Sequence, residues 1–215
     1  MKTLGCLHAH YSNIHYIEKA LSEYPITLQH FVDPGLMLRI TNNPYFTLVE
    51  AKKKVMNQID WIAASGVDAI VITCTNYIAI LDETSKWNIP IIKIDEPFFK
   101  AFSQLRSPQT LIFTNPETVG GTTKRLNNFL HQINKPLNYT IKIIPKAFEY
   151  LMSGNIAEHN EILYKELTKL KYDNTGSLAI AQLSMVEAGE NTQATLLNLL
   201  DPLIEEILAQ FHLSN

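Results

Sequence analysis

The chain alternates short apolar, β-branched segments with longer stretches of helical period, and this alternation limits the fold more than any other feature. The apolar segments predict strands near residues 2–7, 26–32, 68–73, 89–94, 109–114, 140–144 and 177–181. Helices are expected near residues 14–24, 48–64, 118–132, 156–170 and in the C-terminal stretch, where Pro202 should divide or kink the last helix. This order is typical of an α/β protein with mostly parallel sheets and helices on both faces.

The same order of elements occurs twice, at an offset of roughly 110 residues. This duplication predicts two similar Rossmann-like lobes, residues 1–96 and 97–192, with the C-terminal helix 193–215 packing back on the first lobe. The link between them should lie near residues 94–107. Because parallel sheets bind ligands at the carboxyl ends of their strands, we expect an active-site cleft between the lobes.

Composition excludes several classes of function. The net charge is −3 and no basic field is present, so nucleic acid is not expected as a partner. No apolar run is long enough to cross a membrane, and the N-terminus lacks the pattern of a secretion signal, so we expect no membrane partner and a cytoplasmic protein. With two cysteines, Cys6 and Cys74, the chain should carry free thiols.

Cys74 is the first candidate for chemistry. It follows the apolar segment 68–73, at the point where a strand is expected to give way to a helix. Free backbone N–H groups at a helix N-terminus favour the thiolate, and the adjacent Thr75 and Asn76 offer donors for a carboxylate. The alternative is a small buried side chain without a function, because free cysteine is often buried.

Three stretches resemble a known family. The segment Val-Ile-Thr-Cys-Thr-Asn at 71–76 is similar to the first cysteine motif of the aspartate/glutamate racemase superfamily, which includes hydantoin racemases, maleate isomerases and arylmalonate decarboxylases. Residues 111–119, Leu-Ile-Phe-Thr-Asn-Pro-Glu-Thr-Val, resemble the opening of that family's second lobe, and residues 178–185, Leu-Ala-Ile-Ala-Gln-Leu-Ser-Met, resemble a variant of its second cysteine motif. The resemblance covers nearly the whole chain.

The resemblance implies a racemase-type isomerase that uses no metal or organic cofactor and acts beside the carboxylate of a small amino or dicarboxylic acid. It also allows a homodimer. Cys74 would be the acid/base, and the substrate-binding residues implied are Thr75, Asn76, Thr114, Thr118 and Gln182.

The second cysteine of the family's racemases is absent. Those enzymes place one thiol on each face of the α-carbon, whereas here the repeat offset brings Cys74 onto Leu183, with Ser184 as the nearest hydroxyl. Serine is a much weaker acid/base than cysteine, so Ser184 is a weak candidate for the opposite face. A one-cysteine decarboxylase or lyase of the same fold, and a non-catalytic carboxylate-binding protein, are therefore alternatives.

The first strand supplies a helper and a rival interpretation. His8 at its end could tune Cys74 or carry a proton, because imidazole titrates near neutrality. Cys6, which we expect to be structural, alternates with His8 and His10, so a metal-dependent hydrolase using His8 and His10 is a further alternative. No second cluster of ligands supports it. Dinucleotide, P-loop and α/β-hydrolase signatures are also missing.

Overall fold

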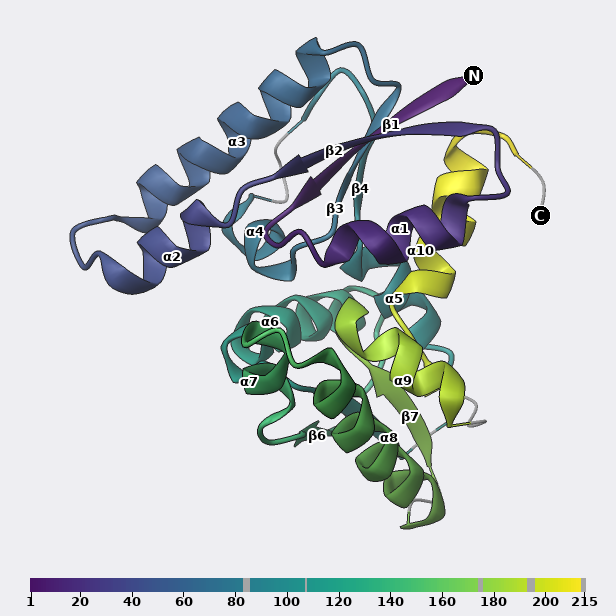
Figure 1. The fold of residues 1–215 in the computed structure, drawn as a ribbon. Coiled ribbons are helices and arrows are strands. Elements are labelled where there is room, and N and C mark those ends of the chain that lie inside the picture. Colours follow the sequence, from purple (N-terminus) through teal and green to yellow (C-terminus); the bar gives the residue numbers. More distant parts are fainter. Residues whose placement is uncertain (83–85, 107, 174–175, 193–195, 214–215) are drawn as a thin grey trace. The chain divides into compact units, whose positions relative to one another are not determined.

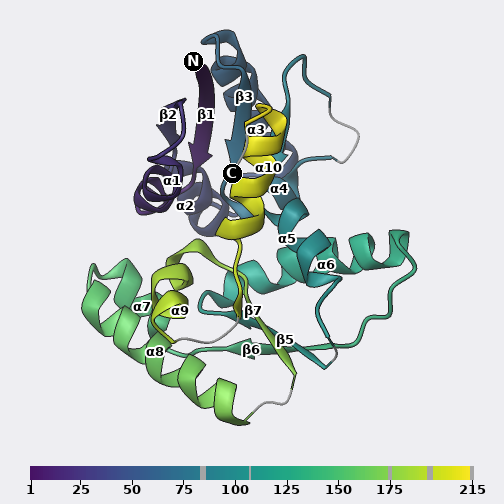
Figure 2. The same ribbon diagram turned by 90° about the vertical axis from the view of Figure 1, so that its right-hand side faces the viewer.

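The computed structural model describes residues 1–82, 86–106, 108–173, 176–192 and 196–213 (Figures 1 and 2). Ser107, at the end of the predicted link, and residues 193–195 and 214–215 of the predicted C-terminal segment lie outside the described residues. The chain divides into two compact units, Met1–Glu96 with Ile204–Asn215 and Pro97–Leu203.

Unit 1 contains a four-stranded sheet in the order β2-β1-β3-β4, in which every neighbouring pair is parallel. Its elements, in chain order, are β1 (Lys2–His8), α1 (Asn13–Leu21), β2 (Ile26–Val32), α2 (Gly35–Asn42), α3 (Leu48–Ala64), β3 (Ala69–Ile72), α4 (Thr75–Ile80) and β4 (Ile91–Lys93). Helix α5 (Asp95–Phe102) crosses the boundary into unit 2.

The two faces of strand β1 are covered by different helices. Gly5 faces α3 so closely that an added Cβ would lie 2.7 Å from Cγ2 of Ile62, so this approach requires glycine. Because successive residues of a strand point to opposite faces, Cys6 and His8 point away from α3. On that opposite side, Glu18 of α1 approaches His30 of β2, with 3.8 Å between Oε1 and Nε2. The sheet is therefore covered on both faces.

Unit 2 repeats this topology, with a parallel sheet in the order β6-β5-β7-β8. Its elements are β5 (Gln109–Phe113), α6 (Pro116–Gln132), β6 (Tyr139–Ile143), α7 (Ala147–Met152), α8 (Ile156–Asp173), β7 (Ser177–Ile180), the 3-10 helix η1 (Leu183–Met185), α9 (Val186–Asn191) and β8 (Leu196–Leu197). Helix α10 (Leu200–Gln210) begins in unit 2 and continues in unit 1. The expectation of two similar α/β lobes is confirmed, and the repeated strand order supports the duplication that the offset predicted.

The seven expected strands are confirmed to within two residues, but the sequence missed α2, α7, η1, α9 and the two-residue strand β8, and it took the segment that contains α5 as part of the link. The expectation for Pro202 was wrong. Helix α10 begins at Leu200, so Pro202 lies in its first turn, where backbone N–H groups have no partner within the helix and proline costs little. Among the helices of the described ranges, none combines the length and the apolar character that a membrane span requires.

Candidate active site

Cys74 lies at the carboxyl end of β3, one residue before α4 begins. The four residues of β3 are buried, and Cys74 itself has an extended backbone and a half-buried side chain. Thr75 and Asn76 are the first two residues of α4 and are also half-buried. The strand-to-helix turn expected from the sequence is therefore present, and part of the Cys74 residue remains exposed.

The protonation of Cys74 differs from the expectation. Burial raises the pKa of the Cys74 thiol to about 11, although the backbone N–H groups of Tyr77 and Asn76 act in the opposite direction. The helix N-terminus therefore does not make this cysteine a thiolate at neutral pH. The raised pKa favours the protonated thiol at neutral pH.

His8 contacts the residue just before Cys74. Its Nδ1 lies 2.8 Å from Oγ1 of Thr73, with which it shares a hydrogen bond. Oγ1 of Thr73 also accepts a hydrogen bond from Nδ2 of Asn13 at 3.3 Å and lies 3.3 Å from the carbonyl oxygen of Leu7. This network joins the carboxyl ends of β1 and β3 and fixes the backbone from which Cys74 projects.

Both ring nitrogens of His8 are engaged, because Nε2 lies 2.9 Å from Nδ1 of His30. The side chain is fully buried, and burial together with the nearby His30 lowers the pKa of His8 to about 4. His8 is therefore neutral at pH 7. Its observed contacts are those of a positioning residue for the turn that holds Cys74.

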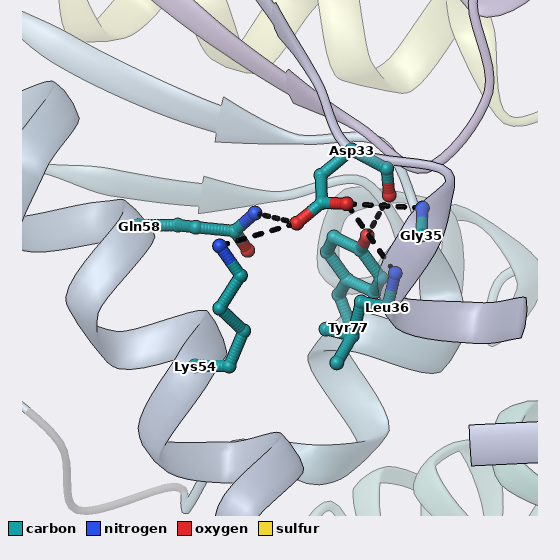
Figure 3. A network of polar contacts seen from close by, with 6 residues as sticks. All are labelled: Asp33, Gly35, Leu36, Lys54, Gln58 and Tyr77. Carbon is teal, nitrogen blue, oxygen red and sulfur yellow. Dashed lines mark hydrogen bonds and ion pairs between the residues drawn. The ribbon is translucent and has the colours of Figure 1, made fainter. Parts of the chain in front are cut away.

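Asp33 follows β2 and organises the neighbouring loop, as Figure 3 shows. Oδ1 accepts hydrogen bonds from the backbone N–H groups of Gly35 at 3.0 Å and Leu36 at 3.3 Å, at the start of α2. Oδ2 accepts a hydrogen bond from Gln58 and forms an ion pair with Nζ of Lys54 at 3.4 Å, both on α3 (Figure 3). The carboxylate thus ties the end of β2 to two helices.

Tyr77 connects this loop to the turn at Cys74. Its hydroxyl donates a hydrogen bond to the backbone carbonyl of Asp33 (Figure 3), and the ring is fully buried. Burial, then the nearby Cys74 and Asp33, raise the pKa of Tyr77 above its usual range. Asp33, Tyr77 and Cys74 therefore belong to one cluster at the carboxyl edge of the first sheet.

Unit 1 also has an open groove of about 630 Å³ along the β2 side of α3, and Cys74 does not line it. Asp33 belongs both to this groove and to the cluster at Cys74. The residues that line the groove are Leu7, Phe31, Val32, Asp33, Lys54, Asn57, Gln58, Trp61 and Ile62. The groove is therefore a neighbour of the candidate site and not the space in front of the thiol.

In unit 2, Gln182 holds the end of β5. Its Oε1 accepts three hydrogen bonds, from the backbone N–H of Thr114 at 2.6 Å, the Thr114 hydroxyl at 2.9 Å and the backbone N–H of Asn115 at 3.0 Å. Asn115 in turn caps α6 by accepting the N–H of Glu117 at 3.0 Å. The structure brings Thr114 and Gln182 together, and the amide oxygen occupies donors that a carboxylate oxygen could otherwise use.

The other two candidates of unit 2 lie on the same sheet edge. Thr118 is buried, and its hydroxyl donates to the carbonyl of Asn115 at 2.9 Å. Ser184 is buried in η1, and its carbonyl oxygen lies 3.0 Å from Nε2 of His159. Nδ1 of His159 lies 2.7 Å from the carbonyl of Ala147, so this buried ring joins η1 to the start of α7.

The histidine set of the rival metal site is not the one expected. Strand β1 ends at His8, so His10 lies beyond it, and its Nδ1 is 2.8 Å from the Ser12 hydroxyl. Among the described residues, the group of three that could hold a metal consists of Cys6, His8 and His30. His30 comes from β2, a partner that only the pairing of the strands reveals.

Comparison with solved structures identifies the architecture. An aspartate racemase from Picrophilus torridus superposes with a TM-score of 0.73 at 13% identity, over 97% of this chain and 94% of that one. A glutamate racemase from Bacillus anthracis gives 0.69 at 12% identity, over 98% and 82% of the two chains. An allantoin racemase from Klebsiella pneumoniae gives 0.65 at 14% identity, over 100% and 90%.

The fold is that of the aspartate, glutamate and allantoin racemases. No protein-family model matches the sequence. No curated protein gives a significant match either. The racemase fold is thus established by structure, while the low identity leaves the reaction and the substrate to be argued from the site.

Sequence reasoning missed several residues that shape the racemase-fold site. Asn115 precedes Pro116 at the start of α6, and an Asn-Pro pair at a helix start is a recognisable capping signal. Thr73 and Tyr77 flank Cys74, and this nearness in the sequence is the signal that could have identified them. His30 and His159 act through contacts with residues far away in the sequence, for which a single chain carries no local signal.

Proposed function

We propose that this chain is a racemase-type isomerase that acts at the carbon beside the carboxylate of a small amino or dicarboxylic acid, with Cys74 as its acid/base. The observation that carries the proposal is a half-buried thiol at the end of β3 and the start of α4, within a racemase fold. Hydrogen bonds of Thr73 and Tyr77 hold the residues on either side of it.

Each unit offers donors of the kind that can hold a substrate carboxylate. In unit 1, Thr75 and Asn76 offer side-chain donors and the backbone N–H groups of the first turn of α4. In unit 2, Thr114 and Thr118 are the proposed contacts; Gln182 positions Thr114, and the two hydroxyls would exchange their present acceptors, Oε1 of Gln182 and the carbonyl of Asn115, for the substrate. Such donors stabilise the negative charge that develops when the α-carbon loses a proton or a carboxyl group.

The raised pKa of Cys74 gives the thiol a defined role. With a pKa of about 11, only about one thiol in ten thousand is ionised at pH 7. For racemisation, a group on the opposite face, for which Ser184 is the weak candidate, first takes the α-proton; the Cys74 thiol then donates its proton to the carbanion and becomes a thiolate. That thiolate is then a strong base, which can remove an α-proton in the next turnover and return to the thiol.

A second candidate is one-sided chemistry by a decarboxylase or lyase of the same fold. The observation in its favour is the lack of a second accessible thiol: the chain has two cysteines, and Cys6 is fully buried within β1. In a decarboxylation, loss of CO₂ leaves the carbanion, and Cys74 supplies the single proton that replaces it. Ser184 would be needed for inversion, but its hydroxyl is a weak acid/base.

The proposal is tested by hydrogen exchange in deuterated water. Separate D and L forms of small amino acids, together with dicarboxylic acids, are incubated with the full chain while NMR follows the α-hydrogen signal and the release of CO₂. Exchange with retained configuration indicates one-sided chemistry, and exchange with inversion shows that another group acts on the opposite face. If no acid exchanges or loses CO₂ faster than in protein-free buffer, the proposed function is wrong.

A further inference from the structure

Three soft or borderline metal donors converge inside unit 1, on the sheet face that points away from α3. Cys6 and His8 are two residues apart on β1, and His30 of β2 is the register partner of Cys6. One donor atom from each residue lies within 4.8 Å of the other two. Cys6 and His8 are fully buried, and 15% of the His30 side chain is exposed.

The second nitrogen of each imidazole faces an oxygen. Nδ1 of His8 lies 2.8 Å from the Thr73 hydroxyl, while Nε2 of His30 points towards Oε1 of Glu18 at 3.8 Å. Histidines that bind metals typically use one nitrogen for the ion and place the other against a carboxylate, carbonyl or hydroxyl that fixes the ring. Within the described residues, His8 Nε2 and His30 Nδ1 therefore contact only each other, at 2.9 Å.

His30 gives an independent indication. Its Nε2 is buried and makes no hydrogen bond within the part of the chain that the structure describes. If the two facing nitrogens share one proton, either His30 Nε2 or His8 Nδ1 is left without a proton. A bare Nε2 would face the Glu18 carboxylate, which is unfavourable. With the proton on His8 Nε2, the bare Nδ1 can accept from the Thr73 hydroxyl and His30 Nε2–H faces Glu18. An ion between the rings likewise leaves a proton on the outer nitrogen of each ring.

We propose that Cys6, His8 and His30 form a binding site for a divalent transition-metal ion, with Zn²⁺ as the ion of best fit. A thiolate and two imidazoles are donors that zinc prefers, whereas Mg²⁺ and Ca²⁺ require oxygen ligands. Two imidazole nitrogens bound to one tetrahedral zinc lie about 3.3 Å apart, so the rings must separate by a few tenths of an ångström. Cys6 must turn its sulfur towards them. The fourth position is left to water or a small anion.

The proton balance of binding is simple. Three bonds form, to Sγ of Cys6, Nε2 of His8 and Nδ1 of His30, and the S–H bond of Cys6 breaks, releasing one proton to solvent. The proton shared between the rings moves to an outer nitrogen, so both histidines remain neutral. No oxidant or reductant is involved.

The ion would link β1 to β2. Because His8 is hydrogen-bonded to Thr73, the ion would also make the turn that carries Cys74 more rigid. This role is structural: the bound ion is separate from the proposed chemistry of Cys74. The inference goes beyond the proposed function and can be right or wrong independently of it.

The experiment uses Co²⁺ and Zn²⁺ on the purified full chain. After removal of metals with a chelator, Co²⁺ is titrated in while absorption is recorded, because a thiolate ligand produces a charge-transfer band that histidine alone does not. We expect the wild type to bind about one equivalent with this band, and Zn²⁺ to displace it. Cys6→Ser should abolish the band, and Glu18→Gln should weaken Co²⁺ binding by about 10- to 100-fold.

Matched controls locate the site. Cys74→Ser leaves Cys6 as the remaining thiol, and His10→Gln removes a histidine outside the proposed site. Both variants should retain the band and its stoichiometry. His30→Gln changes a partly exposed side chain and provides a second test in case Cys6→Ser does not fold. It should lose the charge-transfer band while its circular dichroism spectrum matches that of the wild type. A wild type without the band, or a band that survives Cys6→Ser or disappears with Cys74→Ser, overturns the proposal.

Discussion

The Cys74 thiol is subject to two opposing effects at the scale of the single residue. The backbone N–H groups at the start of α4 favour the thiolate, but burial favours the thiol and prevails, so its pKa rises to about 11. Since the thiolate is the form that reacts with alkylating reagents, reactivity is low below this pKa and increases with pH.

The alkylation rate of Cys74 should therefore rise about tenfold per pH unit from about pH 7 to about pH 10. Peptide-resolved mass spectrometry after timed iodoacetamide pulses measures this rate separately for both cysteines. Cys6 is the internal comparison: burial raises its pKa to about 12, and it should react more slowly throughout. A rate for Cys74 that levels off near pH 9 would indicate an ordinary thiol.

Gln182 offers a second test at the residue scale. Its Oε1 accepts three hydrogen bonds from Thr114 and Asn115, so Gln182→Leu leaves these donors without their acceptor. We expect the free energy of unfolding to fall by about 1–3 kcal/mol, measured by urea denaturation. Gln182→Glu keeps an acceptor oxygen for all three donors and should retain stability. Equal losses in both variants would contradict the assigned contacts.

At the scale of elements, His159 joins pieces of unit 2 that are distant in the sequence. The ring of this buried residue on α8 contacts the carbonyls of Ala147 and Ser184. His159→Leu should lower the free energy of unfolding by about 1–3 kcal/mol, because a buried carbonyl loses its donor. His131→Leu, on an exposed position near the end of α6, is the control and should change stability little. Similar urea midpoints for both variants would count against the bridge.

Helix α3 has a capping box at its start. Oγ1 of Thr47 accepts the N–H of Glu50 at 3.2 Å, and the Glu50 carboxylate accepts the N–H of Thr47 at 2.8 Å. Thr47→Ala should reduce the free energy of unfolding by about 1 kcal/mol, as measured by thermal or urea denaturation. Thr47→Ser keeps the acceptor and should behave like the wild type; a loss as large as that of alanine would contradict the cap.

The elements show what the sequence could and could not predict. The strands that carry Cys74 and Thr114 are runs of apolar residues bounded by polar turns, so their ends were predictable to within two residues. Helix α2 was missed because a Pro-Gly pair, here Pro34 and Gly35, is a common turn signal, although it also suits a helix start. Contacts such as His8 with His30 depend on strand pairing, and no local pattern reveals them.

At the scale of the whole molecule, the two units share one strand order. In the sequence, this duplication is visible as an order of elements that repeats at a constant offset. The same comparison shows where the units diverge: β3 is followed by Cys74, while β7 is followed by Gln182 and the 3-10 helix with Ser184. Because a single substitution at such a position changes the chemistry but not the fold, the architecture was predictable and the reaction was not.

The central claim is that Cys74 moves the proton at the substrate's α-carbon. Its most direct test is the rate of α-hydrogen exchange on the best substrate found, measured for the wild type, Cys74→Ser and Ser65→Ala. Ser65 is the C-cap of α3, and its variant controls for effects of mutation and purification that are unrelated to the site. We predict that Cys74→Ser lowers the rate by at least about 100-fold while Ser65→Ala leaves it unchanged. An unchanged rate in folded Cys74→Ser would contradict the account.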